Sequence, residues 1–205
     1  MKTSKFLKIC IAMGIILATA SSFLYITMNE QPAGASETSI NAGSAGLNFY
    51  VWITGSSQGD IDGSVTISGR EGSIAGHQYF HSIYVPIDSQ SGLPTSRRTH
   101  TPVTILKEVD QATPKLLQAL TTGETLVRVI IRFYRLDSSS IEVNYYTVVL
   151  DNAMIISIRE FMPNNKNPET YQPLMEEISF VYERITCTWE EGGIEWQDNC
   201  RDSST

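Results

Sequence analysis

The chain has 205 residues, 41% of them hydrophobic, which suffices for one domain with a sizeable core and some additional segments. Its formal net charge at pH 7 is −7. Residues 1–35 contain three lysines and one glutamate, so residues 36–205 carry the more strongly acidic share of the charge. Proteins that bind nucleic acid need a basic patch for the phosphate backbone, so this balance argues against nucleic acid as a partner.

The N-terminal segment carries a targeting pattern. Lys2, Lys5 and Lys8 form a positive flank, and residues 9–28 follow without a charged side chain. A positive flank before an apolar run is typical of export or membrane insertion. This pattern predicts that residues 1–35 are not part of the folded domain.

Two fates remain open for this segment. An Ala-x-Ala pattern at Ala33 and Ala35 would allow cleavage before Ser36, as in a signal peptide. The apolar run is also long enough, at about 20 residues, to span a bilayer as an uncleaved signal-anchor. In that case residues 9–28 would contact the membrane, and the rest of the chain would lie on its far side.

Composition divides the chain into three parts. Residues 1–35 are the targeting segment. Residues 36–46, rich in small and polar side chains, predict a flexible linker. Residues 47–205 are expected to form the folded domain.

The domain begins with a succession of short strands. Runs rich in aromatic and β-branched residues predict strands at 48–54, 65–67, 77–85 and 101–109. Polar segments containing glycine or proline predict loops at 56–63 and 86–98, the second of them long or protruding.

One helix is expected next. Thr113 is a suitable N-cap and Pro114 suits the first helical position, where no backbone N–H is needed. Leu116, Leu117 and Leu120 form an apolar stripe, and Gly123 can end the helix in the left-handed conformation.

Longer strands fill the second half of the domain. They are expected at 126–136, 141–150, 153–161, 174–189 and 194–200, with a turn at Asp151-Asn152 and a terminal hairpin around Gly192-Gly193. Closely spaced strands with one short helix predict a mainly β fold, a small antiparallel barrel or sandwich with a flanking helix.

Several of these strands are apolar on both faces. In residues 126–136, one face carries Val127, Val129, Ile131 and Phe133, and the other carries Leu126, Arg128, Ile130, Arg132 and Tyr134. A sheet with one face in water should be polar on that face. Either the second face is covered by other parts of the chain, or it is a subunit interface formed by Arg128, Ile130, Arg132 and Tyr134.

The residues give no support for catalysis, a cofactor or a metal site. The sequence contains no G-x-S-x-G elbow, no Walker A motif and no G-x-G-x-x-G loop. His77 and His81 are four apart, but on a strand that spacing separates them by roughly 13 Å. We expect them to be ordinary polar histidines, and His100 to make structural hydrogen bonds.

Cys187 and Cys200 flank the terminal hairpin and could form a disulfide if the domain reaches an oxidising compartment. A two-residue turn at Gly192-Gly193 would place Cys187 opposite Asp198 rather than Cys200. A bridge would therefore need a bulge or a bent strand end.

Four short segments in fixed order carry the most specific signal. They are Arg70-Glu71-Gly72-Ser73-Ile74, Thr99-His100-Thr101-Pro102, Lys107-Glu108-Val109-Asp110 and Thr121-Thr122-Gly123-Glu124-Thr125-Leu126. With the hairpin at residues 185–196, they make residues 47–200 resemble the haemolysin-coregulated protein (Hcp) family.

The resemblance implies a homohexameric ring with a central channel, and rings stacked into the inner tube of a type VI secretion system. It implies sheath, spike and effector proteins as partners, with no enzymatic activity. Residues 86–98 would correspond to the loop that family members use between rings, with Pro86, Asp88, Gly92, Pro94, Arg97 and Arg98.

The targeting segment departs from the family, whose members begin at the first strand and stay cytoplasmic until they are ejected. Three hypotheses therefore remain. The chain could be a tube or carrier subunit secreted through the type VI system. It could be an Hcp-like accessory protein at the inner membrane or in the periplasm. It could also be a secreted β-barrel binding module or enzyme that shares only the fold.

Overall fold

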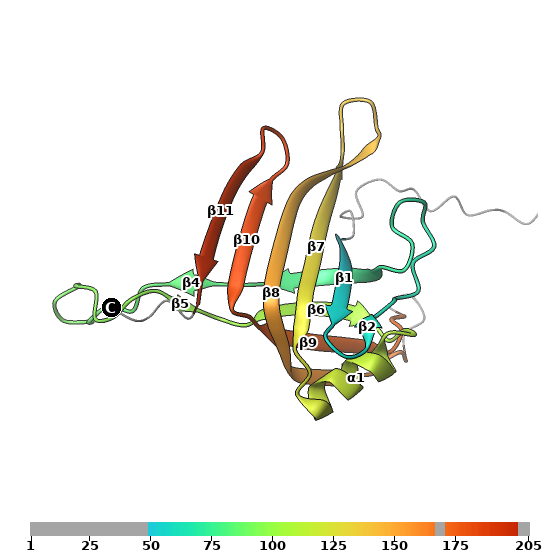
Figure 1. The fold of residues 1–205 in the computed structure, drawn as a ribbon, viewed down its shortest axis with the longest axis horizontal. Coiled ribbons are helices and arrows are strands. Elements are labelled where there is room, and N and C mark those ends of the chain that lie inside the picture. Colours follow the sequence, from blue (N-terminus) through green and yellow to red (C-terminus); the bar gives the residue numbers. More distant parts are fainter. Residues whose placement is uncertain (1–48, 167–170, 201–205) are drawn as a thin grey trace, which may run out of the picture. The chain divides into compact units, whose positions relative to one another are not determined.

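The computed structural model describes residues 49–166 and 171–200, and Figure 1 shows their arrangement. Within these residues the chain forms eleven strands and one helix. The elements are β1 (Phe49–Gly55), β2 (Gly59–Asp60), β3 (Ile74–Phe80), β4 (Ile83–Tyr84), β5 (Thr99–His100), β6 (Val103–Glu108), α1 (Thr113–Thr122), β7 (Leu126–Leu136), β8 (Glu142–Phe161), β9 (Met175–Val181), β10 (Arg184–Trp189) and β11 (Ile194–Asn199).

Six strands close into an antiparallel barrel. Their order is β8-β7-β1-β3-β6-β9, and pairing of β9 with β8 completes the circle. Strands β10 and β11 continue the sheet from β8 and stand upright to the left of β8 in Figure 1. The prediction of a mainly β barrel with one short helix is confirmed.

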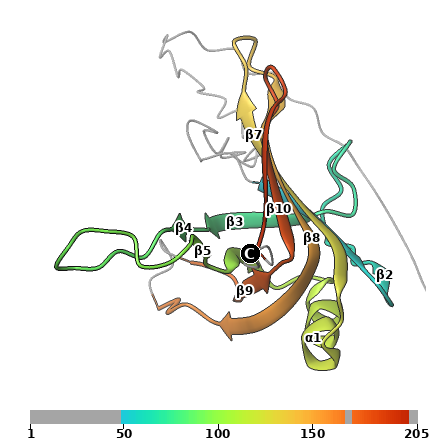
Figure 2. The same cartoon turned by 60° about the vertical axis from the view of Figure 1, so that its left-hand side comes forward.

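Strand β8 belongs to both parts of this structure. Its residues 146–151 pair with β10, whereas Met154–Phe161 pairs with β9. Figure 2 shows β8 curving from the upright sheet into the base of the barrel. The turn expected at Asp151-Asn152 is wrong, because the chain bends there without leaving the sheet. Asn152 makes the bend at φ 50°, a conformation that asparagine tolerates better than most residues.

The strand expected at 174–189 is two strands for the same reason. β9 follows the second half of β8 and β10 follows the first, so the chain must turn at Tyr182-Glu183, opposite the bend. The amide of Glu183 donates to the Asp151 carbonyl over 3.2 Å, and the Asn152 side chain donates to the Glu183 carboxylate over 2.9 Å. These two bonds join the bend in β8 to the turn between β9 and β10.

The faces of β7 differ from the prediction at its beginning. Arg128 pairs with Thr54 and Leu126 pairs with Gly55, so Val127 is passed over in a bulge. A bulge reverses the alternation of side chains. Leu126 therefore joins Val129 and Ile131 in the core, while Val127 is 49% exposed.

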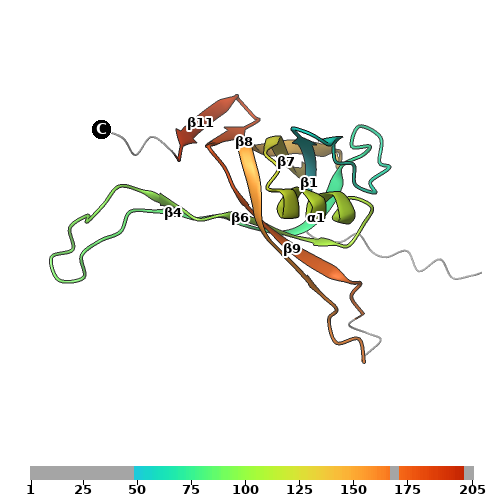
Figure 3. The ribbon, with the colours of Figure 1, turned by 60° about the horizontal axis from the view of Figure 1, so that its bottom comes forward.

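The helix lies over the lower end of the barrel, as Figure 3 shows. Its apolar face is formed by Leu116 and Ala119, both buried, with Leu120 packed beside them, whereas Leu117 is exposed. Gly123 ends the helix at φ 65°, as expected. Thr113 is the first helical residue rather than the N-cap.

Thr113 serves instead as part of a buried ion-pair cluster. Lys107 on β6 and Glu176 on β9 are fully buried and form a salt bridge. The Lys107 ammonium also contacts the Asp110 carboxylate at 2.9 Å and the Glu108 carbonyl at 2.7 Å. The Thr113 hydroxyl donates to Glu176 over 2.7 Å, which ties the start of the helix to the barrel.

Breaking this ion pair should destabilise the domain strongly. Lys107→Met leaves the Glu176 carboxylate buried without a counter-charge, and we expect it to lower the free energy of unfolding by about 3–5 kcal/mol. Urea unfolding measures the difference. Arg159→Met is the control, because it removes an exposed ion pair with Glu177 that also joins two strands of this sheet, β8 and β9. It should lower the free energy of unfolding by less than about 1 kcal/mol. Equal losses in the two variants would contradict this assignment.

Candidate assembly surfaces

Residues 82–101 form a protruding hairpin, which we call the extended loop (Figure 2). Strands β4 and β5 pair at its base, and a bridge joins Ile87 to Pro94 further out. At the tip the Asp88 carboxylate accepts the amides of Gln90 and Ser91, which lowers the pKa of Asp88. The loop is thus internally hydrogen-bonded. All six residues selected from the sequence lie on it: Pro86, Asp88, Gly92, Pro94, Arg97 and Arg98.

Apolar side chains on the extended loop face solvent. Ile87 is 64% exposed and Leu93 is 65% exposed, and Tyr84 and Val85 are about half exposed. Solvent-exposed apolar groups that are close together favour contact with another protein. The extended loop is therefore a candidate contact surface.

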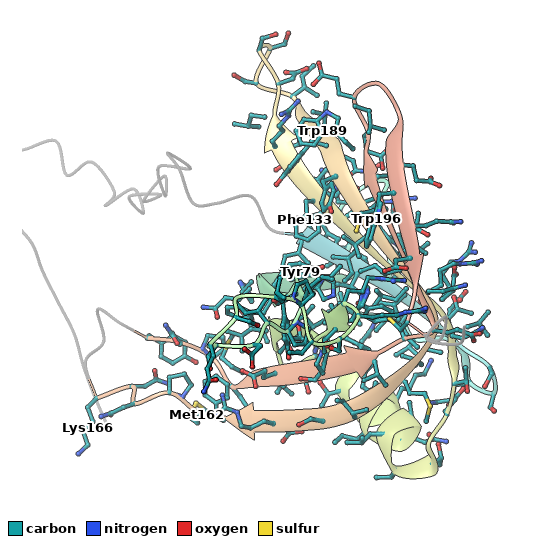
Figure 4. The ribbon with its side chains drawn as sticks, turned by 90° about the vertical axis from the view of Figure 1, so that its left-hand side faces the viewer. Tyr79, Phe133, Met162, Lys166, Trp189 and Trp196 are labelled. Carbon is teal, nitrogen blue, oxygen red and sulfur yellow. The ribbon has the colours of Figure 1, made fainter. Side chains whose placement is uncertain are left out.

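A second apolar surface lies on the upright sheet. We call Phe133, Tyr146, Trp189, Ile194 and Trp196 the aromatic wall. Figure 4 shows Trp189 high on the sheet, Phe133 and Trp196 level with each other below it, and Tyr79 lower still. Ile194 is 69% exposed and Trp196 is 46% exposed. A groove of about 490 Å³ runs beside this wall and is lined also by His81, Ile83, Cys187 and Glu195.

The aromatic wall was missed from the sequence. Its signal lies in Trp189, Ile194 and Trp196, which flank the terminal turn. The structure shows a four-residue turn at 190–193 instead of the two-residue turn expected, and Trp189 pairs with Ile194. With this register the apolar residues of β10 and β11 fall on neighbouring positions of one hairpin.

The same register separates the two cysteines. Cys187 lies opposite Trp196, and the amide of Cys200 donates to the Glu183 carbonyl. Both thiols are free, and the disulfide considered from the sequence is not formed in the structure. Burial raises the pKa of each thiol.

The outer face of β7, proposed from the sequence as a subunit interface, is partly used within the chain. Arg128 pairs with Asp151 at 3.1 Å, and the Arg132 guanidinium lies 5.0 Å from the centre of the Trp52 ring. Ile130 is half-buried beside Arg132 in a cleft of about 320 Å³. Tyr134 is covered by Arg70.

Arg70 fastens the loop before β3 to this face. Its side chain is 8% exposed and its guanidinium lies 3.8 Å from the centre of the Tyr134 ring and 4.7 Å from that of Tyr50. It also pairs with Glu142 at 2.7 Å. The strand expected at 65–67 does not form, because residues 61–73 fold back on themselves in this loop.

The other residues of the four sequence segments also connect parts of the fold. The Ser73 hydroxyl donates to the Arg70 carbonyl, and Gly72 adopts φ 71°. The Glu124 carboxylate accepts the amides of Ser57 and Gln58, which fixes the β1–β2 turn and lowers the pKa of Glu124. The remaining members are placed as follows: Glu71 lines the cleft beside β7, Thr101 and Pro102 end the extended loop, Glu108 contacts His77, and the hydroxyls of Thr121 and Thr122 bond to carbonyls of α1.

The described part of the chain has neither a metal-binding cluster nor a helix suited to a bilayer. Among residues 49–166 and 171–200, no group of three or more His, Cys, Asp or Glu side chains could hold a metal ion. None of the helices described there combines the length and apolarity needed to cross a bilayer. The targeting segment at 9–28 and the cleavage site at Ala33, Ala35 and Ser36 lie outside the described residues.

Comparison with known proteins decides the family. The family model described as "Type VI secretion system effector, Hcp" matches residues 50–189. This chain belongs to the Hcp family. The Hcp resemblance seen in the four segments is therefore confirmed.

The match with this chain extends over nearly the whole length of each of three relatives. The major exported protein of Pseudomonas aeruginosa is 37% identical over 162 residues, 74% of this chain and 94% of that protein. The structure of Hcp1 from E. coli EAEC 042 is 32% identical, with a TM-score of 0.68 over 75% of this chain and 99% of that one. Hcp3 of Pseudomonas aeruginosa is 32% identical, with a TM-score of 0.63 over 76% and 99%.

The Arg70 contacts should contribute measurably to stability. Arg70→Met removes the ion pair with Glu142 and the two aromatic contacts, and we expect a loss of about 1–3 kcal/mol in urea unfolding. Arg135→Met is the matched control, since Arg135 also pairs with a carboxylate and lies over two rings but is 44% exposed. That variant should lose less than about 1 kcal/mol. A larger loss from Arg135→Met than from Arg70→Met would contradict this account.

Proposed function

We propose that this Hcp-family chain is a tube-forming subunit of a type VI secretion system, which closes into hexameric rings that stack, hold effector proteins and are exported. Family membership supports the secretion system. The name of the Pseudomonas aeruginosa relative, which is called an exported protein, supports export. The six-fold number and the carrying of effectors are what the Hcp resemblance implies.

Two apolar surfaces carry the proposal: the aromatic wall, and the outer part of the extended loop around Ile87 and Leu93, beyond the base of the loop where Ile83 lines the groove beside the wall. The aromatic wall belongs to the sheet of β7, β8, β10 and β11, and the extended loop projects away from the barrel (Figure 1). Ring closure and ring stacking are different contacts, and the ring contact joins two different patches of neighbouring copies head to tail. We assign the aromatic wall to one side of the ring contact, and the extended loop to the contact between rings.

The role proposed is mechanical. The polar clusters described above join one element of the fold to another: Lys107–Glu176 joins β6 to β9, Arg70 joins a loop to β7, and Glu124 joins the helix exit to the β1–β2 turn. We therefore assign no catalytic step to the chain. Sheath and spike proteins would be its partners in the secretion machine.

A second candidate function rests on the N-terminal segment. The uncharged residues 9–28 behind three lysines favour an accessory Hcp-like protein at the inner membrane or in the periplasm. In this alternative, residues 47–205 would form the same domain after a linker at 36–46. Retention of the full chain in the membrane fraction would distinguish this candidate from a secreted tube subunit.

Native mass spectrometry tests the function directly. We expect the purified full-length chain, and a chain starting at Ser36, to give a mass six times that of the protomer. A monomer in both cases would contradict the mechanical function and leave only the barrel fold. A hexamer that forms only after removal of the leader would support cleavage before assembly.

Two substitutions should separate the two contacts. Ile194→Asp places a charge on the aromatic wall and should reduce ring formation at least tenfold, whereas Leu93→Asp should leave rings intact and prevent stacking. The magnitude follows from losing the burial of one large apolar side chain, about 1.5–3 kcal/mol. Native mass and electron microscopy of tubes are the two readouts.

Ile67→Asp provides the matched control, because Ile67 is 49% exposed but lies on the loop before β3. This variant should form rings and tubes like the unchanged chain. Rings that persist in Ile194→Asp, or tubes that persist in Leu93→Asp, would contradict the corresponding assignment.

A further inference from the structure

The extended loop meets the barrel at a cluster of five polar side chains. His81 stands at the start of the loop, and Arg98 and His100 stand at its end. Tyr182 comes from the corner between β9 and β10, and Asp198 comes from β11. The cluster thus joins the loop to two elements of the body that are distant from it in sequence.

The contacts form a single chain of hydrogen bonds. Nε2 of His81 lies 2.6 Å from the Tyr182 hydroxyl, and the same hydroxyl lies 2.9 Å from Nδ1 of His100. Nε2 of His100 lies 2.9 Å from the Asp198 carboxylate, which also forms a salt bridge with Arg98. The side chains of His100 and Asp198 are 7% and 12% exposed, so solvent contributes little to these bonds.

Only one arrangement of protons satisfies the chain when both histidines are neutral. An ionised Asp198 can only accept, so Nε2 of His100 donates to it and Nδ1 of His100 is an acceptor. The Tyr182 hydroxyl then donates to Nδ1 of His100, and its oxygen accepts the N–H of His81. Every donor between His81 and Asp198 has an acceptor.

We propose that these side chains are a proton-sensitive latch, which holds the extended loop against the body when His81 and His100 are neutral and releases it when both rings are protonated. One added proton leaves the chain satisfied, because the Tyr182 hydroxyl can donate to whichever histidine is still neutral. With a proton on each ring, both rings face the Tyr182 oxygen as donors, and the hydroxyl proton has no acceptor in the chain. A proton on His81 adds a positive charge to a ring whose centre is 6.1 Å from that of His100.

Charge balance favours release in acid. Asp198 and Arg98 carry opposite charges, so two added protons give the five side chains together a net charge of +2. Among the described residues, the other titratable groups facing the cluster are the Cys200 and Cys187 thiols and the Tyr79 hydroxyl, which act on Tyr182, and Glu195, which lines the groove beside His81. A neutral thiol or hydroxyl does not offset the added charge. The Glu195 carboxylate contacts the Thr188 hydroxyl at 3.5 Å rather than a histidine of the cluster.

The sign of the pH effect follows from His81. Burial, and then the neighbouring His100, hold the pKa of His81 below its ordinary value of 6.5. The latched state therefore binds fewer protons than the released state. The stability of the latch is present above about pH 6.5 and is lost progressively as the pH falls below that value.

Hydrogen–deuterium exchange of the full-length chain tests the latch. A two-stranded hairpin that is not packed on a body is only marginally stable in water, so release should expose the amides of residues 82–101. We expect their protection factors, which correct for the pH dependence of intrinsic exchange, to fall about tenfold between pH 7.5 and 5.5, because pH 5.5 lies one unit below the ordinary histidine pKa of 6.5. The amides of β1 in the same sample should keep their protection.

Variants identify the groups responsible. The double variant His81→Gln/His100→Gln cannot gain these protons and should lose the pH dependence. Tyr182→Phe removes the shared hydroxyl and should give low protection in the loop at both pH values. His77→Gln is the matched control, since His77 contacts Glu108 on β6 rather than the latch, and should behave as the unchanged chain does.

The outcomes separate this inference from the proposed tube. Equal loop protection at the two pH values in the unchanged chain, or a fall that persists in the double variant, would overturn the latch. The native mass is measured in the same samples. A monomer at both pH values would contradict the ring, whereas loop protection would still decide the latch, because the five side chains belong to one protomer.

Discussion

The bend in β8 is the constraint on which the rest of the fold depends. One strand of 20 residues has to close the barrel with its second half and support the upright sheet with its first half. Asn152 makes the change of direction in the left-handed conformation. Arg184 and Arg128 both reach the Asp151 carboxylate beside it, and so hold β10 and β7 to the same corner. Without this corner the barrel and the aromatic wall would belong to separate sheets.

Between β6 and β9 the barrel is held together by polar side chains as well as by apolar packing. Lys107 and Glu176 are buried across β6 and β9, and the Thr113 hydroxyl extends their contact to the helix. A buried pair of charges is a weak source of net stability, but it penalises any register that separates the two groups. This contact accounts for the burial of two polar residues, Lys107 near the end of β6 and Thr113 at the start of α1.

Much of the fold could be predicted from local sequence patterns. The predictions fail where distant parts of the chain meet. The helix between Thr113 and Gly123 and the strand at 126–136 follow from composition and turn residues. The uninterrupted β8 could not be foreseen, because Asp151-Asn152 is an ordinary turn sequence unless both halves find partners. The aromatic wall and the cluster around Tyr182 depend on register across β10 and β11, which a four-residue turn determines and the sequence leaves open.

The position of β11 at the edge of the main sheet also has a consequence for aggregation of the protomer. This strand is the outer strand of the main sheet in the described part of the chain, so one row of its backbone N–H and C=O groups lacks a strand partner there. Such edges promote uncontrolled strand addition and aggregation. β11 is six residues long and carries Glu195 and Asp198, and short, charged strands discourage such pairing. A short and charged edge strand thus limits uncontrolled strand pairing in a protomer that carries exposed aromatic side chains.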